Sequence, residues 1–306
     1  MKRGRIQAGR SAVAYLYLAP FIVLFLSFGI FPIFYSLFLS FTYWKGLGAP
    51  IFVFLDNYIA TLQDPAFFKA LYNTAYIWTA AHILILPGGF LIAYVLNTEY
   101  VRKKNLHQAL LFTPMVTSTI AVSIVFTTLF GEKYGMINFL LGGLGVSPVA
   151  WFHGTGSMIK PVIIALFVWK WIGWNSVIYF AGMQGIDREL YECAQVEGAN
   201  KRDILRFVTI PLMRPIILYT LILSFIGGMQ IFDEAYILTG GGQGAGYLGG
   251  SNQGGLTIAL LIYDTGFRRG AFGQASAIAY FLMLIIVVLS IFSFRFLSEK
   301  GESSRA

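Results

Sequence analysis

The chain has 306 residues, of which 57% are hydrophobic and only 12% are charged. A soluble protein has about 25% charged residues, so this composition argues against a soluble fold, against intrinsic disorder and, with Cys193 as the only cysteine, against a disulfide scaffold. The net charge of +8 would suit a nucleic-acid partner, an interpretation that depends on where the 22 lysines and arginines lie.

Long stretches without charged residues predict the membrane spans, because a helix needs roughly 20 apolar residues to cross the hydrocarbon core. Six such stretches occur, and only Lys170 interrupts one of them. They predict six transmembrane helices at 15–41, 72–96, 108–130, 160–183, 212–233 and 273–295. The first is longer than the roughly 7–15 apolar residues of a signal peptide, so we expect it to be a retained span. The segment 134–152 is apolar but broken by glycine and proline, which indicates a surface or re-entrant segment.

The lysines and arginines are distributed unevenly among the loops. Fifteen lie in the two tails and in the second-to-third and fourth-to-fifth connections, whereas six lie in the alternate connections. Positive charge is enriched on the cytoplasmic side, so both termini are predicted to be cytoplasmic. The charge is then a topology signal, and no nucleic acid is expected as a partner. The predicted organisation has three parts: a cytoplasmic tail at 1–14, a six-helix transmembrane domain at 15–296 and a second cytoplasmic tail at 297–306. The transmembrane domain includes a cytoplasmic loop at 185–211.

Motifs of catalysis and metal binding are absent from the sequence. There is no nucleotide-binding loop, no nucleophile elbow and no H-E-x-x-H. His82, His107 and His153 lack ligand spacing, and the acidic neighbours of Cys193 do not favour a reactive thiolate. The glycine-rich segment 240–255 lacks a strand-turn-helix context and is expected to be a flexible external loop. We therefore expect no catalytic residue, metal or bound cofactor, and an energy source in another chain.

The polar segment 185–211 predicts two short helices between the fourth and fifth spans. Asp187 can cap a helix that begins at Arg188, and Gly198 can end it at a positive φ. A helix of about ten residues is marginal alone. Its three glutamates disfavour anionic lipid and favour a protein partner with an apolar groove and a basic rim.

The second helix of this segment is predicted just after the first. Asn200 can cap it, and Asp203 three positions later partly completes a capping box. Ile204, Phe207 and Val208 then form an apolar stripe at helical spacing. Pro211 is expected to break the helix before the fifth span.

This segment resembles the EAA loop of ABC importer permeases, whose pattern is E-A-A-x-x-x-G-x9-I-x-L-P. Glu192-Cys193-Ala194, Gly198 and Val208-Thr209-Ile210-Pro211 have the same spacing, with small or apolar replacements at Cys193, Val208 and Ile210. Other stretches are similar to the carbohydrate-uptake branch (maltose, glycerol-3-phosphate and multiple-sugar types): Asp56-Asn57-Tyr58, Leu111-Phe112-Thr113-Pro114, and Gln230-Ile231-Phe232-Asp233.

The resemblance implies a binding-protein-dependent permease with the type I ABC importer fold, in the cytoplasmic (inner) membrane of a bacterium or archaeon, that takes up a sugar or oligosaccharide and is not itself an enzyme. It implies four kinds of partner: membrane lipid, a second homologous permease, two ATPase subunits that carry ATP and Mg²⁺, and an extracytoplasmic solute-binding protein. The helix ending at Gly198 would be the coupling helix. The residues implied in ATPase coupling are Glu189, Glu192, Cys193, Ala194, Glu197, Gly198 and Pro211.

Candidate pathway residues lie in the fourth and fifth spans. Lys170, a charge inside a span, should either face the interior or reach the interface beside tryptophans. Aromatic and amide groups nearby suit a sugar, and comparison with the maltose-type permease places Ser224, Gly227 and Gly228 at sugar-contacting positions. The candidates are Trp171, Trp174, Asn175, Ser224, Gly227, Gly228, Gln230 and Asp233. Asp233 and Glu234 are also open to a simpler interpretation, as solvated residues near the outer end of the span.

Other functions stay open at this point. A glycerol-phosphate or polyol importer would share the fold. A stand-alone secondary transporter would need intramembrane acidic pairs or inverted repeats, and a membrane-embedded enzyme would need a catalytic cluster; neither pattern is visible in the sequence.

Overall fold

The computed structural model describes residues 17–153, 158–240 and 248–302, and the chain forms two compact units. Unit 1 contains the described residues up to Asp64 together with Ile262–Phe281, and unit 2 contains Pro65–Leu261 together with the residues from Leu282 onward. The predicted tail at 1–14 lies outside the described residues, and the predicted tail at 297–306 begins within the last helix, which extends to Glu302.

Unit 1 combines parts of two membrane helices with a small hairpin. Its elements are η1 (Leu26–Ile30), α2 (Phe31–Ser40), β1 (Thr42–Tyr43), β2 (Ile51–Phe52), α3 (Asp56–Gln63), η4 (Asp264–Arg268) and the start of α14 (Phe272–Glu302). The two strands pair antiparallel, with Thr42 opposite Phe52. Asn57 ties α3 to the end of α2, because its Nδ2 donates to the backbone oxygens of Ser40 and Thr42, each at 2.9 Å.

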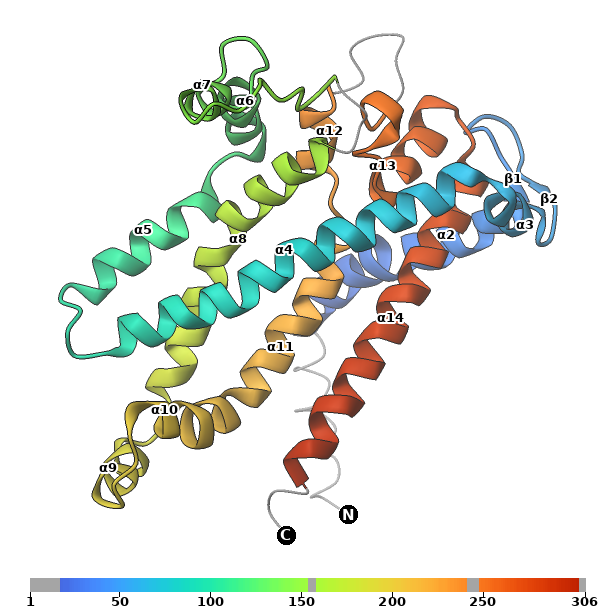
Figure 1. Cartoon of the computed structure of the whole chain (residues 1–306). Helices are drawn as coiled ribbons and strands as arrows, with labels where there is room; N and C mark the ends of the chain where they lie inside the picture. Colours follow the sequence, from blue (N-terminus) through green and yellow to red (C-terminus); the bar gives the residue numbers. More distant parts are fainter. Residues whose placement is uncertain (1–16, 154–157, 241–247, 303–306) are drawn as a thin grey trace, which may run out of the picture. The chain divides into compact units, whose positions relative to one another are not determined.

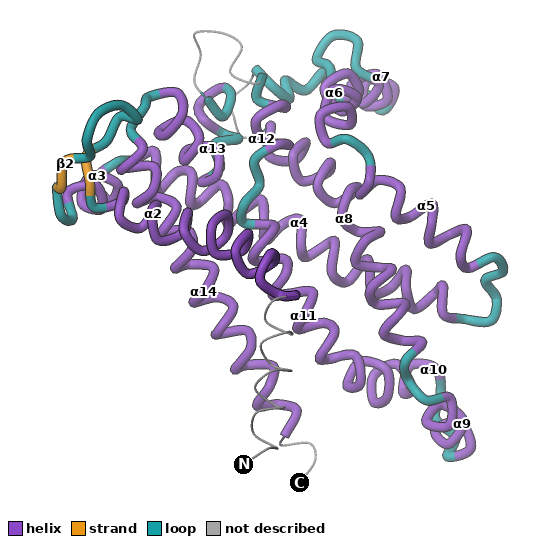
Figure 2. The backbone as a smooth tube through the Cα atoms, turned by 180° about the vertical axis from the view of Figure 1, so that it is seen from behind, coloured by secondary structure: helices purple, strands orange, loops and turns teal. Residues whose placement is uncertain are grey.

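Unit 2 holds most of the helices (Figure 1). They are α4 (Pro65–Asn97), α5 (Lys104–Val116), α6 (Thr119–Leu129), α7 (Met136–Gly143), α8 (Ile159–Gln184), α9 (Arg188–Val196), α10 (Lys201–Asp203), the π-helical η2 (Ile204–Thr209), α11 (Ile210–Gly228), α12 (Asp233–Leu238), the 3-10 turn η3 (Ser251–Gln253) and α13 (Ile258–Tyr263). In both Figure 1 and Figure 2, α4, α8 and α11 run side by side, with α9 and α10 at one end.

Within the described residues, five helices are long and apolar enough to cross a membrane, and a bent pair makes a sixth candidate. They correspond to the six predicted spans, and the all-α polytopic fold is confirmed. The predicted bounds differ from the structure in several places. The second span begins at Pro65 rather than at 72, and the fifth continues a helix that begins at Lys201 rather than at 212. The third span is not continuous, because α5 and α6 meet at a bend of 90° where Thr117 has an extended backbone. The fifth ends at Gly228 rather than at 233, where two consecutive glycines favour the end of a helix.

The core of unit 2 lies between α4 and α8. Tyr179 and Met183 of α8 pack with Ala93 of α4 and Met213 of α11 in one buried cluster. Helix α5 crosses α8 in direct backbone contact, because a Cβ on Gly173 would collide with the carbonyl of Leu111. Close approach at a small residue is how membrane helices gain packing contacts in the absence of water.

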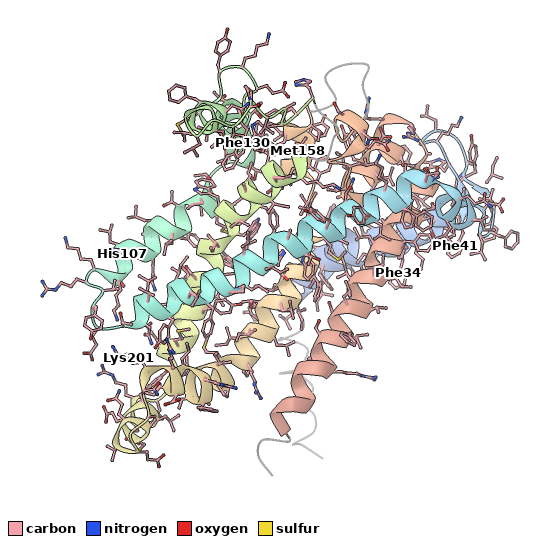
Figure 3. The ribbon with its side chains drawn as sticks, in the orientation of Figure 1. Phe34, Phe41, His107, Phe130, Met158 and Lys201 are labelled. Carbon is pink, nitrogen blue, oxygen red and sulfur yellow. The ribbon has the colours of Figure 1, made fainter. Side chains whose placement is uncertain are left out.

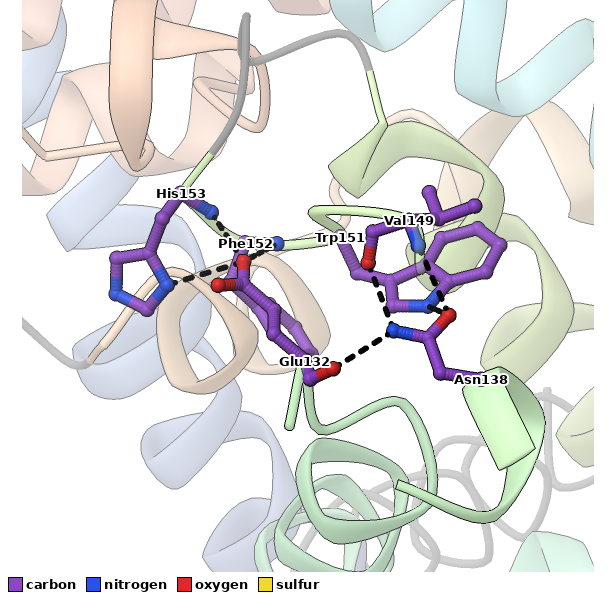
Figure 4. Close-up of polar contacts among 6 residues, drawn as sticks. All are labelled: Glu132, Asn138, Val149, Trp151, Phe152 and His153. Carbon is purple, nitrogen blue, oxygen red and sulfur yellow. Dashed lines mark hydrogen bonds and ion pairs between the residues drawn. The ribbon is translucent and has the colours of Figure 1, made fainter. Parts of the chain in front are cut away.

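The segment predicted as surface or re-entrant contains α7, which is anchored by one amide (Figure 4). Asn138 Nδ2 donates to the backbone oxygens of Glu132 at 3.0 Å and Val149 at 2.9 Å, while Oδ1 accepts from Val149 N and from Trp151 Nε1 at 2.9 Å. Several apolar side chains of α7 are exposed, and Phe139 is 79% exposed. Figure 3 shows Phe130 and Met158 near this end of unit 2, and His107 and Lys201 towards the other.

The Glu132 carboxylate binds the end of the same segment, at Phe152 and His153 (Figure 4). Glu132 Oε1 accepts from the backbone N–H of His153 at 2.9 Å and of Phe152 at 3.2 Å, and lies 3.1 Å from the His153 ring. Partial burial acts to raise the pKa of Glu132, but these donors outweigh it and hold the pKa below its ordinary value.

Candidate functional site

Helix α9 occupies the predicted position and ends in a Schellman motif. Gly198 has φ +85°, its N–H donates to Gln195 O at 3.0 Å, and the N–H of Ala199 donates to Ala194 O at 2.9 Å. The prediction for Gly198 is therefore confirmed. The predicted cap at the other end is wrong in part: Asp187 stands at the N-cap, but its side chain makes no capping hydrogen bond.

The second short helix begins with the predicted capping box. Asn200 Oδ1 accepts from the N–H groups of Arg202 and Asp203, and Asp203 Oδ2 accepts from the N–H of Asn200 at 3.2 Å. The predicted break at Pro211 is wrong, because α10, η2 and α11 join into one span from Lys201 to Gly228. Pro211 is the second residue of α11 and directly follows the π-helical turn η2.

Helix α9 has no buried residue, although it carries apolar side chains. Val196 is 89% and Leu190 46% exposed, and the free thiol of Cys193 is exposed as well. Glu189, Glu192 and Glu197 are exposed on the same helix, and Ala194 is half-buried. The α9 surface thus combines unpaired apolar area with acidic groups, the composition of a protein-docking helix.

Contacts to the neighbouring connection place α9 at a defined end of unit 2. Arg188 lies 3.7 Å from Glu99, and Lys201 Nζ lies 5.2 Å from the ring centre of Tyr100. Both connections rich in positive charge therefore lie at one end, as the charge distribution predicts. Which side of the membrane this end faces stays a prediction.

Two candidate pathway residues serve helix packing. A Cβ on Gly228 would lie 2.6 Å from His82 Cε1 and 2.7 Å from Trp78 Cδ1, so the glycine admits these rings. Trp78 Nε1 donates to the backbone oxygen of Ser224 at 2.8 Å. The prediction overlooked Trp78 and His82, although their spacing of four places them on one face of α4.

The α8 candidates lie in different surroundings. The Trp171 ring contacts Phe167, at 5.9 Å between ring centres, and its buried Nε1 has no hydrogen-bond partner among the described residues. Trp174 instead packs on Phe112 of α5 at 5.5 Å, and Asn175 donates to the Trp171 carbonyl at 3.0 Å. The last three candidates, Gly227, Gln230 and Asp233, are exposed at the end of α11 and the start of α12. The role of the eight candidates in transport stays a prediction.

Lys170 and Glu234 form a buried ion pair, which corrects the expectation for Glu234. The Glu234 side chain is 8% and that of Lys170 9% exposed, so Glu234 is not solvated; Nζ lies 3.8 Å from Oε1. Lys170 also donates to the hydroxyl of Thr119 on α6. Among the described residues no three metal-ligating side chains gather.

Comparison with known proteins agrees with this architecture. Residues 85–301 match the family described as "Binding-protein-dependent transport system inner membrane component". The arabinooligosaccharides transport system permease protein of Bacillus subtilis (strain 168) is 35% identical over 299 residues, covering 96% of this chain and 91% of the relative. The lactose transport system permease protein of Rhizobium radiobacter is 34% identical and covers 92% of both chains.

A solved structure shares the fold. It belongs to a bacterial ABC transporter involved in the import of the acidic polysaccharide alginate, with a TM-score of 0.81 and 23% identity over 97% of this chain and 99% of that chain. The family match and the relatives confirm the resemblance drawn from the EAA-like segment. This chain belongs to the family of binding-protein-dependent transport system inner membrane components, and it is a multi-pass membrane protein.

Proposed function

We propose that this chain is the non-catalytic permease subunit of an ABC importer that takes up a neutral oligosaccharide. The observation that carries the proposal is α9, a capped helix with exposed apolar and acidic side chains and no buried residue. Relatives named for arabinooligosaccharide and lactose transport support the substrate class. Because Lys170 is paired with Glu234, the middle of α8 offers no free charge to a charged sugar.

The proposal assigns four kinds of partner. Two ATPase subunits, which bind ATP and Mg²⁺, lie at the cytoplasmic side, and one of them docks on α9. A second permease completes the pathway, and a solute-binding protein delivers the sugar from outside. Glu192 bonds a basic ATPase residue, and the neighbouring Glu189, Cys193, Ala194 and Glu197 complete the docking surface. Closure of the ATPases then moves α9, which is joined to α8 at one end and to α11 through η2 at the other.

Co-expression with the neighbouring transport genes tests the proposal. An ATPase chain should co-purify with the wild-type protein, and vesicles holding the complex and its binding protein should accumulate an oligosaccharide in an ATP-dependent manner. Gly198→Asp should insert normally yet lose the coupling of ATP hydrolysis to uptake, because an aspartate strains the end of α9 and adds a negative charge to its surface. Normal transport by this variant would refute the assignment of α9.

The panel of sugars should include arabinooligosaccharides, lactose, maltose, an acidic oligosaccharide and glycerol phosphate. Uptake restricted to the charged compounds would contradict the neutral substrate while leaving the importer assignment intact. Absence of an ATPase in the purified complex would contradict the importer itself.

A further inference from the structure

Lys170 lies near the middle of α8, a helix long and apolar enough to cross a membrane. It is the twelfth of the 26 residues of α8. At 1.5 Å per residue, it stands about 17 Å from the start of α8 and about 21 Å from its end. A charged side chain inside a membrane helix is costly unless it has polar partners. The Lys170 ammonium has two: Glu234 Oε1 lies 3.8 Å from Nζ, and the hydroxyl of Thr119 accepts a hydrogen bond from it.

Stability alone does not explain a buried ion pair. Replacing such a pair by apolar residues of similar volume is often neutral or stabilising, whereas removing one partner is strongly destabilising. The pair therefore supplies something that two apolar side chains would lack, namely a specific link between the elements that carry the charges. Here the link joins α8, through Lys170, to α12, through Glu234, and to the first residue of α6, Thr119.

The chain order gives this link a particular place. Helix α8 continues through Gly185–Asp187 into α9, and α10 continues through η2 into α11, so α8 and α11 are the two arms of one helical hairpin with α9 at its tip. Near the tip the arms are held by apolar packing and by Tyr179 and Thr220, whose hydroxyls lie 2.7 Å apart. Glu234 follows the end of α11 by six residues, so the ion pair joins α8 to α12, the helix that follows the α11 arm on the side away from α9 (Figure 1).

We propose that Lys170 and Glu234 form a clasp that holds the α8 and α11 arms together, so that a displacement of α9 moves α8, α11, α12 and the start of α6 as one body. Both are positioning residues for transport. Without the clasp, α12 and the start of α6 lose their charged link to α8, so movement of the tip is transmitted to them less completely. This inference rests on the proposed importer function.

A double-mutant cycle tests the clasp in the assembled transporter. The variants are Lys170→Met, Glu234→Gln and the double variant, with Lys133→Met, an exposed lysine outside the spans, as the control. Each single variant should lower oligosaccharide uptake per assembled complex roughly tenfold or more, because it strands one buried charge. The oligosaccharide transported per ATP hydrolysed should also fall, which a loss of folded protein alone would not produce. The double variant should be no worse than either single one, and Lys133→Met should match the wild type.

Two results would overturn the clasp: single variants with wild-type uptake, or losses that multiply in the double variant. If the single variants assemble poorly, the melting temperature of the complex replaces uptake, and additive decreases then contradict the pairing. A wild-type complex that transports no sugar would refute the importer function, while the melting temperatures still report on the ion pair.

Discussion

Gly198→Ala tests the mechanical role of the end of α9. The backbone at 198 has φ +85°, and no heavy atom lies within 4 Å of an added Cβ, so the substitution changes only backbone strain. An L-residue in this left-handed region costs about 1–2 kcal/mol. Because α9 has no buried residue to resist that strain, we expect its last turn to open roughly five to thirty times more often.

Hydrogen exchange measures this opening directly. The N–H of Ala199 closes the Schellman motif on Ala194 O, so its protection should fall by the same factor in Gly198→Ala, while amides of α8 stay unchanged. Gly198→Asn should show a smaller effect, since asparagine tolerates positive φ. Gly142→Ala is the matched control, because it also has open space around its Cβ but no positive φ. Equal protection of Ala199 in Gly198→Ala and the wild type would refute the reasoning.

Three further predictions concern the packing of unit 2. Gly173→Ala should separate α5 from α8 at the Leu111 carbonyl and lower the free energy of unfolding by about 1–3 kcal/mol, as is typical of overpacking; a lower melting temperature in detergent reports this. Asn73→Ala removes two hydrogen bonds to backbone oxygens just before α13, at 2.9 and 3.0 Å, and should increase proteolysis of that segment. Acid should loosen the segment after α7. Because the pKa of Glu132 is lowered, its contribution to stability is full above the ordinary value of 4.5 and is lost as the pH falls through the lowered value. Hydrogen exchange at the N–H groups of Phe152 and His153 reports this loss.

Each of these has a discriminating comparison. Gly143→Ala on α7 has free space and should leave the melting temperature unchanged, unlike Gly173→Ala. Asn73→Asp keeps the shape but removes the donors, and a segment as resistant as the wild type would contradict the hydrogen-bond role. Glu132→Gln should abolish the acid dependence, and an unaltered pH profile in that variant would assign it to another group.

The spans could be predicted from the sequence because membrane crossing imposes length and apolarity on each helix separately. The bend between α5 and α6 was missed, because the residues around Thr117 are as free of charge as a straight span requires. Pro114 lies inside α5, three residues before the bend, and was a usable signal of it. The contact between Lys170 and Glu234 could not be predicted, for a different reason. The two residues are 64 positions apart, and no local pattern in either segment indicates its partner.

The candidate site was predictable where it depends on local geometry. A capping box and a glycine at positive φ are encoded within a few residues, so Asn200, Asp203 and Gly198 behave as predicted. Pro211 fails the same test, because its effect depends on the π-helical turn before it, which has no clear sequence pattern. The packing at Gly228 was not predictable in this way, because the two rings beside it come from α4, far away in the sequence.

Helix α4 is longer than the hydrocarbon core of a membrane is thick, so one end of it must extend beyond that core. Its 33 residues span about 50 Å, against about 30 Å of hydrocarbon. Even a tilt of roughly 40°, the upper end of the usual range, leaves about 8 Å of the helix outside the hydrocarbon core. The end near Lys69, which bonds Asn252 at 3.0 Å, is polar enough to be that part. The length of α4 therefore places the segment around η3 at the level of the lipid headgroups or beyond, at a height set by the helix rather than by the loop.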